Sequence, residues 1–203
     1  MAEPDWREER KGGMLAIGAS VAVSAIIWVA LWRLLPPLSG MDAIGARMLV
    51  ALKCVAAATL FCLVAGVEAV AHERLQSNAF DPLQGHQTER LRVNQRYLQN
   101  TLEQLIVFAV GLFGIAAYLD SGSSMRIVIA STVVWILNRF AFWIGYHRSA
   151  AMRGLGAPSM VIGLVMLLYV VARIGGDVAG TAGMIIAIAL FLALEAVLFL
   201  KTR

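Results

Sequence analysis

Six long apolar segments, separated by short polar stretches, dominate this chain of 203 residues. They run at about 14–32, 46–71, 97–119, 127–146, 159–174 and 180–200. Because roughly 20 helical residues cross the hydrocarbon core of a bilayer, the first, second, fourth and sixth segments are long enough outright. The third qualifies if its polar start reaches the interface, and the fifth qualifies if it begins at Pro158 and stands nearly upright. The pattern predicts an all-α integral membrane protein.

The boundaries between these segments carry turn-forming residues. They are Pro36-Pro37 with Ser39-Gly40, Asp120 to Ser124, Gly154 to Pro158, and Gly175-Gly176. The first segment does not resemble a cleaved signal peptide, because Glu8 and Glu9 precede it and a proline pair follows it. We therefore expect it to be retained as a helix.

Composition supports a membrane protein and argues against a soluble one. Apolar residues make up 60% of the chain and charged residues 15%, against about 45–50% and about 25% in soluble domains. Cys54 and Cys62 share one apolar segment and are expected to be small hydrophobic residues, not a disulfide. The basic pI, near 9.4, is explained by cationic loops, so no nucleic-acid partner is expected.

The distribution of basic residues predicts the orientation. With a cytoplasmic N-terminus, the cytoplasmic side holds Arg7, Arg10, Lys11, Arg74, Arg90, Arg92, Arg148, Arg153, Lys201 and Arg203, whereas the opposite side holds Arg33, Arg47, Arg126 and Arg173. Lys53, Arg96 and Arg139 lie within helices. Because Lys and Arg concentrate in cytoplasmic loops, both termini of this multi-pass protein are predicted to be cytoplasmic.

A polar stripe marks the start of the third segment. Arg92, Arg96, Asn100 and Glu103 are spaced four, four and three residues apart, which places them on one helical face. Ionisable groups inside a span are costly and are candidates for function. The stripe could also satisfy its own polar groups and hold helices together. When no ligand is bound, we expect Glu103 to pair with Arg96 or with an arginine of a neighbour.

A second polar stripe, at the end of the fourth segment, contains Asn138, Arg139 and Tyr146. In the predicted orientation, this helix ends on the membrane side where the third segment begins. The two stripes therefore converge, and Arg74 and Arg153 join them from the adjoining loops. The sequence predicts an arginine-rich pocket that opens to the cytoplasm.

This set of side chains suits a ligand with several carboxylates, amides and an amine. Arginine pairs with carboxylates through two parallel hydrogen bonds, while Glu103 could bind an ammonium group and Asn100 an amide. Glutathione has all of these groups. Phospholipid headgroups and nucleotides would also bind arginine, but they give Glu103 no role. His72, His86 and His147 lack metal-ligand spacing, so no metal site is expected.

Three motifs resemble the MAPEG family, the membrane-associated proteins of eicosanoid and glutathione metabolism. Arg96-Tyr-Leu-Gln-Asn100-Thr-Leu-Glu103 resembles the R-x-x-x-N-x-x-E signature of the family's second helix. The segment from Arg139 to Arg153 is similar to the third-helix ending of leukotriene-C-synthase-like members, with Tyr146 and Arg153 in register. The segment from Arg74 to Phe80 is similar to the end of the first helix.

The resemblance covers about 46–174 and implies a four-helix bundle that forms a homotrimer. It implies that glutathione binds between subunits on the cytoplasmic side as a co-substrate. Arg74, Arg96, Asn100, Glu103 and Tyr146 would bind it, with Arg139 supporting, and Arg153 would stabilise the thiolate. Phe142 stands where relatives often have Tyr or His.

The remaining parts of the chain lie outside the four-helix pattern. They are a cytoplasmic N-terminal segment, 1–13, an extra transmembrane helix, 14–35, and an extra C-terminal transmembrane helix, 180–200. The two extra helices could cover the outside of the trimer, cover the entrance for an acceptor, or mark a distinct subfamily.

The leading functional hypothesis is a membrane glutathione transferase that conjugates the glutathione thiolate to a lipophilic electrophile. Peroxidase activity toward lipid hydroperoxides is a second activity that the sequence leaves open. Arg153 and Tyr146 are the candidate catalytic residues. The partners would be membrane lipids and a lipophilic small molecule. The alternatives are a non-catalytic membrane module that binds glutathione or partner helices, and a small transporter, although no inverted repeat supports transport.

The first testable prediction concerns topology. A tag fused after Arg203 should be accessible from the cytoplasmic side, because the basic residues are concentrated on that side. Protease protection in sealed vesicles measures this, with a tag at the N-terminus as its internal comparison. Accessibility of the C-terminal tag from the opposite side alone would contradict the orientation and the converging pocket.

Overall fold

The structure is a computed structural model that describes residues 6–202, all of them helical or in loops. Its elements are α1 (Trp6–Leu34), α2 (Ile44–Ala58), η1 (Thr59–Val64), α3 (Ala65–Leu75), η2 (Pro82–Gln84), α4 (Glu89–Tyr118), α5 (Gly122–Arg148), η3 (Ala151–Gly156) and α6 (Ala157–Lys201). Within the described residues, five helices are long and apolar enough to cross a membrane. The prediction of an all-α integral membrane protein is confirmed.

The second apolar segment forms one continuous helical rod from α2 through η1 to α3. The middle part, η1, is a π-helical stretch of six residues. Such stretches interrupt the regular pattern of backbone hydrogen bonds. Here the Tyr97 hydroxyl of α4 donates a hydrogen bond of 3.1 Å to the carbonyl of Cys62 in η1. This contact attaches the rod to the polar end of α4.

The core lies where α2, α4, α5 and α6 meet, and aromatic and small residues share it. Phe108 of α4 and Trp135 of α5 are fully buried and stack with ring centroids 4.8 Å apart. Glycines let α4 and α6 approach closely: a Cβ at Gly111 would lie 2.9 Å from Met166. Because lipid tails are as apolar as these side chains, close packing of this kind is what holds membrane helices together.

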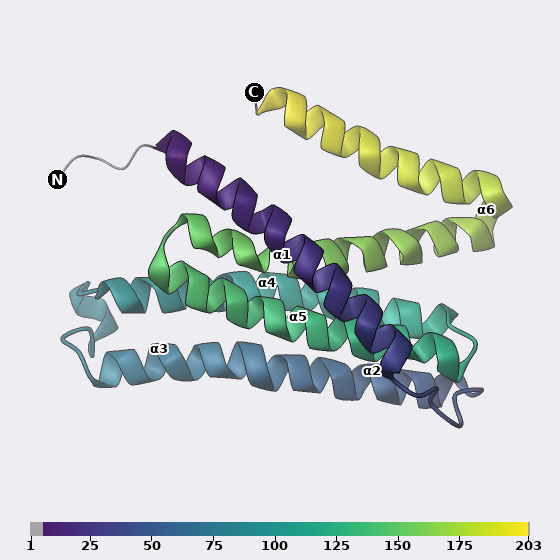
Figure 1. Ribbon diagram of the computed structural model, residues 1–203, viewed down its shortest axis with the longest axis horizontal. Coiled ribbons are helices and arrows are strands. Elements are labelled where there is room, and N and C mark those ends of the chain that lie inside the picture. The colour runs from purple at the N-terminus through teal and green to yellow at the C-terminus, as the bar shows by residue number, and fades with distance from the viewer. Residues whose placement is uncertain (1–5, 203) are drawn as a thin grey trace.

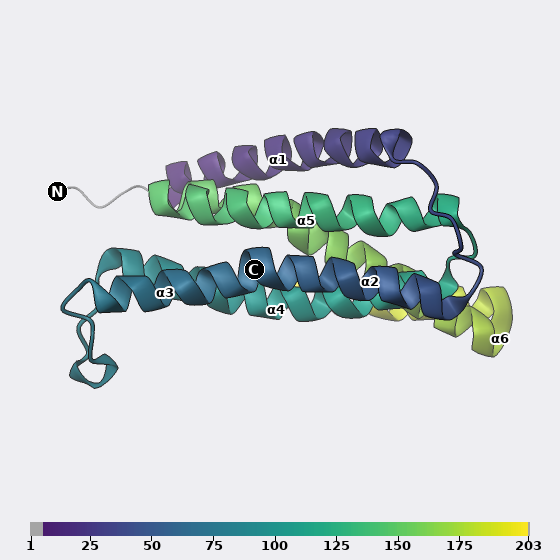
Figure 2. The same ribbon diagram turned by 90° about the horizontal axis from the view of Figure 1, so that it is seen from below.

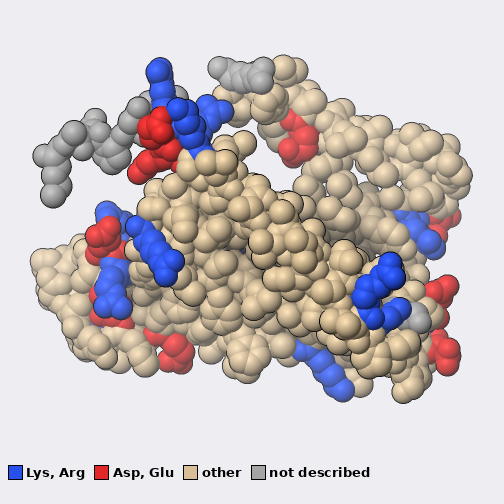
Figure 3. Space-filling model, in the orientation of Figure 1, with Lys and Arg blue, Asp and Glu red and all other residues tan. Residues whose placement is uncertain are grey.

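The helices form layers around α5. Figure 2 shows α1 on one side of α5 and the α2–α3 rod with α4 on the other. In Figure 1, α1 crosses α5 obliquely, while α4 and α5 run along the bundle. Charged residues gather toward the ends of the molecule on the face in Figure 3, and the middle of this face shows few of them, as a lipid-facing surface requires.

The last two apolar segments belong to one helical element, α6, which bends sharply. Figure 1 shows α6 folding back on itself, and the non-helical residues at the bend are Ala179 and Gly180, the latter with φ of 60°. The sequence placed this break at Gly175-Gly176 instead. Those residues are helical, and a Cβ at Gly175 would lie 2.5 Å from the carbonyl oxygen of Gly183. The glycines therefore permit close contact between the two parts of α6, whereas the turn itself lies later.

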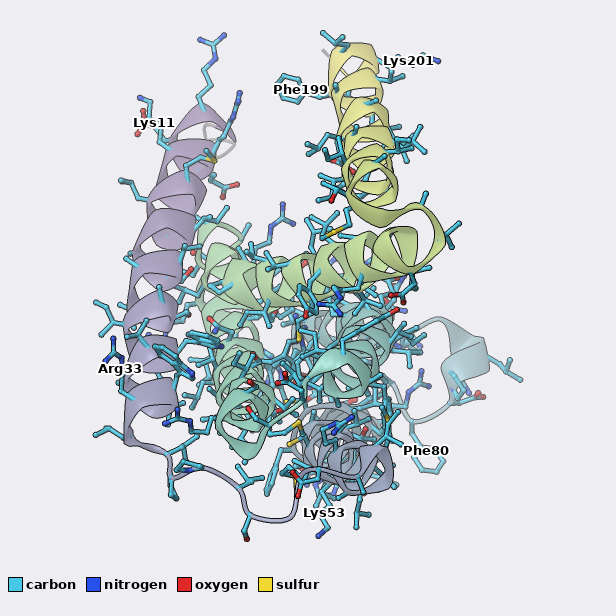
Figure 4. All side chains as sticks on the ribbon, turned by 90° about the vertical axis from the view of Figure 1, so that its right-hand side faces the viewer. Lys11, Arg33, Lys53, Phe80, Phe199 and Lys201 are labelled. Atoms are coloured by element: carbon cyan, nitrogen blue, oxygen red, sulfur yellow. The ribbon has the colours of Figure 1, made fainter. Side chains whose placement is uncertain are left out.

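The first helix begins earlier than the apolar pattern indicated. The helix α1 starts at Trp6, so residues 6–13 of the predicted N-terminal segment are helical, and residues 1–5 lie outside the described part. Lys53 of α2 projects from the bundle surface in Figure 4 and is exposed, as expected of a lysine whose charge reaches for the interface.

The contact between α4 and α6 generates the second prediction. A Cβ at Gly114 would lie 2.5 Å from Cγ2 of Val170, a stiff β-branched side chain. Gly114→Ala should therefore lower the free energy of unfolding by about 1–3 kcal/mol through overpacking. Thermal unfolding in detergent measures this. Gly18→Ala is the matched control, since nothing lies within 4 Å of a Cβ there, and a stability loss of equal size in both variants would contradict the packing argument.

Candidate functional site

A polar cleft of about 380 Å³ opens at the end of the bundle where α4 begins and α5 ends. Its lining comes from α4, α5, η3 and the start of α6, and comprises Arg96, Gln99, Asn100, Glu103, Gln104, Phe142, Tyr146, Arg153, Gly154, Gly156 and Ala157. Five of the residues predicted from sequence are among them. Arg96, Asn100 and Glu103 of the first polar stripe thus meet Tyr146 of the second in one cleft.

The charged groups of α4 in this cleft are joined through a glutamine. Arg96 donates to the Gln99 side-chain oxygen at 3.4 Å, and Gln99 Nε2 donates to Glu103 at 3.1 Å. The expected direct pairing of Glu103 with Arg96 is therefore replaced, within one chain, by an Arg96–Gln99–Glu103 relay. Glu103 and Arg96 are both exposed, and their charged groups face the open cleft.

Arg139 lies beneath the cleft and is fully buried. Its guanidinium donates to Asn100 Oδ1 at 3.0 Å and to Thr101 Oγ1 at 2.8 Å. The rings of Phe142 and Tyr97 lie 4.6 and 5.4 Å from it, close enough for cation–π attraction. Arg139 thus supports the floor of the cleft and does not line it.

A chain of polar contacts continues from Asn100 to α6. Gln104 Nε2 donates to Asn100 Oδ1 at 3.2 Å, and the hydroxyl of the buried Ser159 donates to Gln104 Oε1 at 2.6 Å. Because Asn100 Oδ1 accepts from both Arg139 and Gln104, its Nδ2 group is left to donate elsewhere. The network joins α4, α5 and α6 and fixes the amide orientation of Asn100.

The turn η3 carries Arg153 to the rim of the cleft. It is a short 3₁₀ turn of six residues between α5 and α6. Within the described residues, the Arg153 side chain is exposed and has no hydrogen-bond or salt-bridge partner. On the α5 wall, Tyr146 is half-buried, with its ring 5.6 Å from that of Phe142. A cation and a phenol therefore border the same space.

A second polar cleft, of about 370 Å³, continues from the first. Arg96 and Tyr146 line both, and Arg90, Arg92 and Arg148 line the second. Arg92, the first member of the predicted stripe, therefore belongs to this neighbouring cleft. The combined opening is strongly cationic, and Glu103 lines the first of the two clefts but not the second.

Arg74 does not line either cleft within one chain. It lies half-buried at the end of α3. The rod packs against the opposite face of α4, where Asn94 Nδ2 donates to the carbonyl of Ala69 at 3.4 Å. Arg74 and the cleft are therefore separated by α4, although the sequence predicted that they would converge.

Sequence reasoning missed Gln99, Gln104 and the glycine-lined part of η3. A signal existed for the glutamines, because they lie three and four residues from Arg96 and Asn100 on the same helical face. No sequence pattern indicated Asn94, whose carboxamide oxygen accepts from Trp143 at 2.9 Å and faces His147 at 2.9 Å. It is a buried polar link between α4 and α5, outside the cleft.

The fold and the cleft define a class: a helical membrane protein with an arginine-rich site at one end of its bundle. A model of the MAPEG family matches residues 49–175, more than half of the chain, and the chain belongs to the MAPEG family. The match spans the rod, α4, α5, η3 and the first part of α6, and the resemblance inferred from the motifs is confirmed. No curated protein and no solved structure matches the chain.

Removing the guanidinium beneath the cleft generates the third prediction. Arg139→Met should destabilise the bundle by roughly 2–5 kcal/mol, because Asn100 and the buried Thr101 lose their charged hydrogen-bond donor. Denaturant unfolding in detergent tests this. Arg92→Met is the matched control and should stay within about 0.5 kcal/mol, as exposed substitutions do. Equal stability of the two variants would show that Arg139 is not a structural support.

Proposed function

We propose that this protein is a membrane glutathione transferase that joins the glutathione thiolate to a lipophilic electrophile. Membership of the MAPEG family supports a glutathione-related membrane role of transferase or isomerase type. The observation that carries the finer proposal is the cleft itself. Its charged residues come from two elements: Arg96 and Glu103 from α4, and Arg153 from η3.

The charges of the cleft complement those of glutathione. Arg96 pairs with a glutathione carboxylate, and Glu103 pairs with the ammonium group. The Nδ2 group of Asn100 donates to an amide carbonyl, since its oxygen already accepts from Arg139 and Gln104. The proposal assigns Arg74 to the site of a neighbouring subunit in a homotrimer, because it lies on the other face of α4 in its own chain.

The chemistry needs a thiolate, and Arg153 supplies the stabilising charge. A free thiol has a pKa of about 8.5, and a cation within a few ångströms lowers the pKa by roughly 1–3 units. The glutathione thiol loses its proton to solvent, and the sulfur lone pair then forms the new bond to the electrophilic carbon. The displaced electron pair leaves with the leaving group or is protonated by water. The Tyr146 hydroxyl donates to the sulfur.

The acceptor comes from the bilayer. Phe142, Gly156 and Ala157 give one wall of the cleft an apolar surface. A lipophilic electrophile meets the sulfur there, while the carboxylates stay at the cationic rim. In this proposal the polar substrate enters the cleft from the cytoplasm, and the apolar substrate enters it from the membrane.

The decisive experiment measures thiolate formation. Glutathione added to the purified protein should produce an ultraviolet thiolate signal at neutral pH, with S-methylglutathione, which has no thiol, as the control. Binding of glutathione without this signal would identify a non-catalytic binding module. Absence of binding would remove the glutathione assignment altogether.

The fourth prediction separates binding from chemistry. Arg153→Ala should raise the pKa of the bound glutathione thiol by about 1 unit or more and lower turnover at neutral pH roughly tenfold, with partial rescue at higher pH. The sign follows from the charge: without the cation, thiolate forms only at higher pH. Arg96→Ala should weaken glutathione binding with no such rescue. Rate profiles against pH, with binding titrations, measure both effects.

A profile for Arg153→Ala that runs parallel to the wild type and is merely lower would contradict the role of Arg153. Tyr146→Phe then becomes the variant to examine, since Tyr146 lines the same cleft and its hydroxyl can donate a hydrogen bond to sulfur. If Arg153→Ala lost as much glutathione affinity as Arg96→Ala, this result would also contradict the assignment of binding to Arg96 and of thiolate stabilisation to Arg153.

A further inference from the structure

The turn that carries Arg153 is covered by a helix that lies outside the family match. The match begins at residue 49, whereas α1 ends at Leu34. Nevertheless α1 packs directly against η3 and α5, as Figure 2 shows for its course along α5. The extra helix therefore reaches the proposed catalytic region from outside the four-helix bundle.

The face of α1 that makes this contact is a stripe of small residues. Gly12, Ala16, Ser20 and Ser24 follow one another at intervals of four, and Trp28 continues the row. Ser20 and Ser24 are buried, whereas Gly18, on another face, is exposed. Small residues at this spacing allow two membrane helices to approach until their backbones nearly touch.

At η3 the approach is close enough to exclude a side chain at Gly154. A Cβ at Gly154 would lie 2.8 Å from the carbonyl oxygen of Gly13 and 3.1 Å from Cγ1 of Ile17. A Cβ at Gly12 would lie 3.5 Å from that of Ala151. The Ser20 hydroxyl lies 3.5 Å from the carbonyl oxygen of Gly154, to which it donates. The backbone of α1 is thus in contact with the backbone of the turn.

Further along, α1 is fixed to α5 by hydrogen bonds. The Ser24 hydroxyl donates to Asn138 Oδ1 at 3.1 Å, and Asn138 Nδ2 lies 2.9 Å from the Ser24 oxygen. Trp28 Nε1 donates to Ser131 Oγ at 3.0 Å. Because these hydrogen bonds anchor the C-terminal half of α1 to α5, the N-terminal half of α1 forms a rigid wall against η3.

The other side of the turn rests on α5. A Cβ at Gly145 would collide with the carbonyl of Met152, and a Cβ at Gly156 would collide with Phe142. The turn is therefore held between α1 and α5, and both contacts depend on glycines. Within the described residues the Arg153 side chain has no hydrogen-bond or salt-bridge partner. The backbone of η3 therefore sets the position from which this side chain extends toward the cleft.

We propose that α1 is a positioning element for the reaction: its small-residue face presses η3 against α5 and so holds Arg153 at the rim of the cleft. This inference rests on the proposed function. It assigns Gly13 and its neighbours on α1 a role in the chemistry that they exert through η3 and Arg153, because they do not line the cleft.

The test enlarges α1 at the contact and away from it. Gly13→Leu places a bulky side chain against Ala151, whereas Gly18→Leu places the same side chain in open space. Gly13→Leu should shift the pH–rate profile upward by about 0.5–1 unit and reduce turnover at neutral pH about threefold to tenfold, as a thiol pKa higher by that amount requires. Glutathione affinity should change less than twofold. Gly18→Leu should match the wild type.

A second readout does not depend on catalysis. Hydrogen exchange of the backbone from Ser149 to Gly156 should accelerate in Gly13→Leu and stay unchanged in Gly18→Leu. Gly13→Ala, whose Cβ would lie 3.7 Å from the Ala151 oxygen, should behave as the wild type in both measurements. If Gly13→Leu does not yield folded protein, Ala16→Val makes a smaller change on the same face, with the same expected shifts.

The outcomes separate this inference from the function on which it rests. A wild-type pH profile and wild-type exchange in both Gly13→Leu and Ala16→Val, alongside a shifted profile for Arg153→Ala, would overturn the positioning role alone. A parallel, lowered profile for Arg153→Ala would overturn the role of Arg153 and this inference with it. A shifted profile with faster exchange in the contact variants, and in neither control, is the result expected.

Discussion

The buried guanidinium of Arg139 is the interaction on which the polar end of the bundle depends. Inside a bilayer a cation needs partners, and within the described residues no carboxylate pairs with Arg139. Amide and hydroxyl oxygens from Asn100 and Thr101, with the rings of Tyr97 and Phe142, compensate it instead. Glu103 is consequently not consumed in neutralising Arg139, and its negative charge is available at the cleft for a cationic group.

This arrangement divides the site into a fixed floor and an adjustable rim. Asn100 accepts hydrogen bonds from Arg139 and Gln104, and Gln104 accepts one from Ser159. Residues of α4, α5 and α6 therefore fix the position of the Asn100 side chain. The charged side chains above it are exposed and connected only through one glutamine. A rigid floor orients a ligand with little loss of freedom on binding, whereas exposed cations attract it from solution.

Much of the fold followed from sequence because a membrane leaves few choices. Apolar length predicted the helices, and spacing by three and four placed Arg96, Asn100 and Glu103 on one face. The bend of α6 at Gly180 was not predictable, since Gly175 and Gly176 give the stronger local signal, and only the packing against Gly183 shows why they stay helical. The separation of Arg74 from the cleft within one chain could not be predicted for a related reason: spacing along one helix does not indicate which face of a neighbouring helix it packs against.

The contact between α1 and η3 illustrates how a helix added to a bundle acquires a role. A helix that packs through large side chains could shift by several ångströms at small cost, because such side chains change rotamer. Backbone contact at Gly13 and Gly154 has no such freedom, since interiors packed at this density resist compression. An added helix that docks through glycines therefore transmits its own position to whatever the turn carries. Here the turn carries Arg153, for which the described residues provide no hydrogen-bond or salt-bridge partner, so we infer that the geometry of the rim depends in part on a segment outside the bundle that forms the floor.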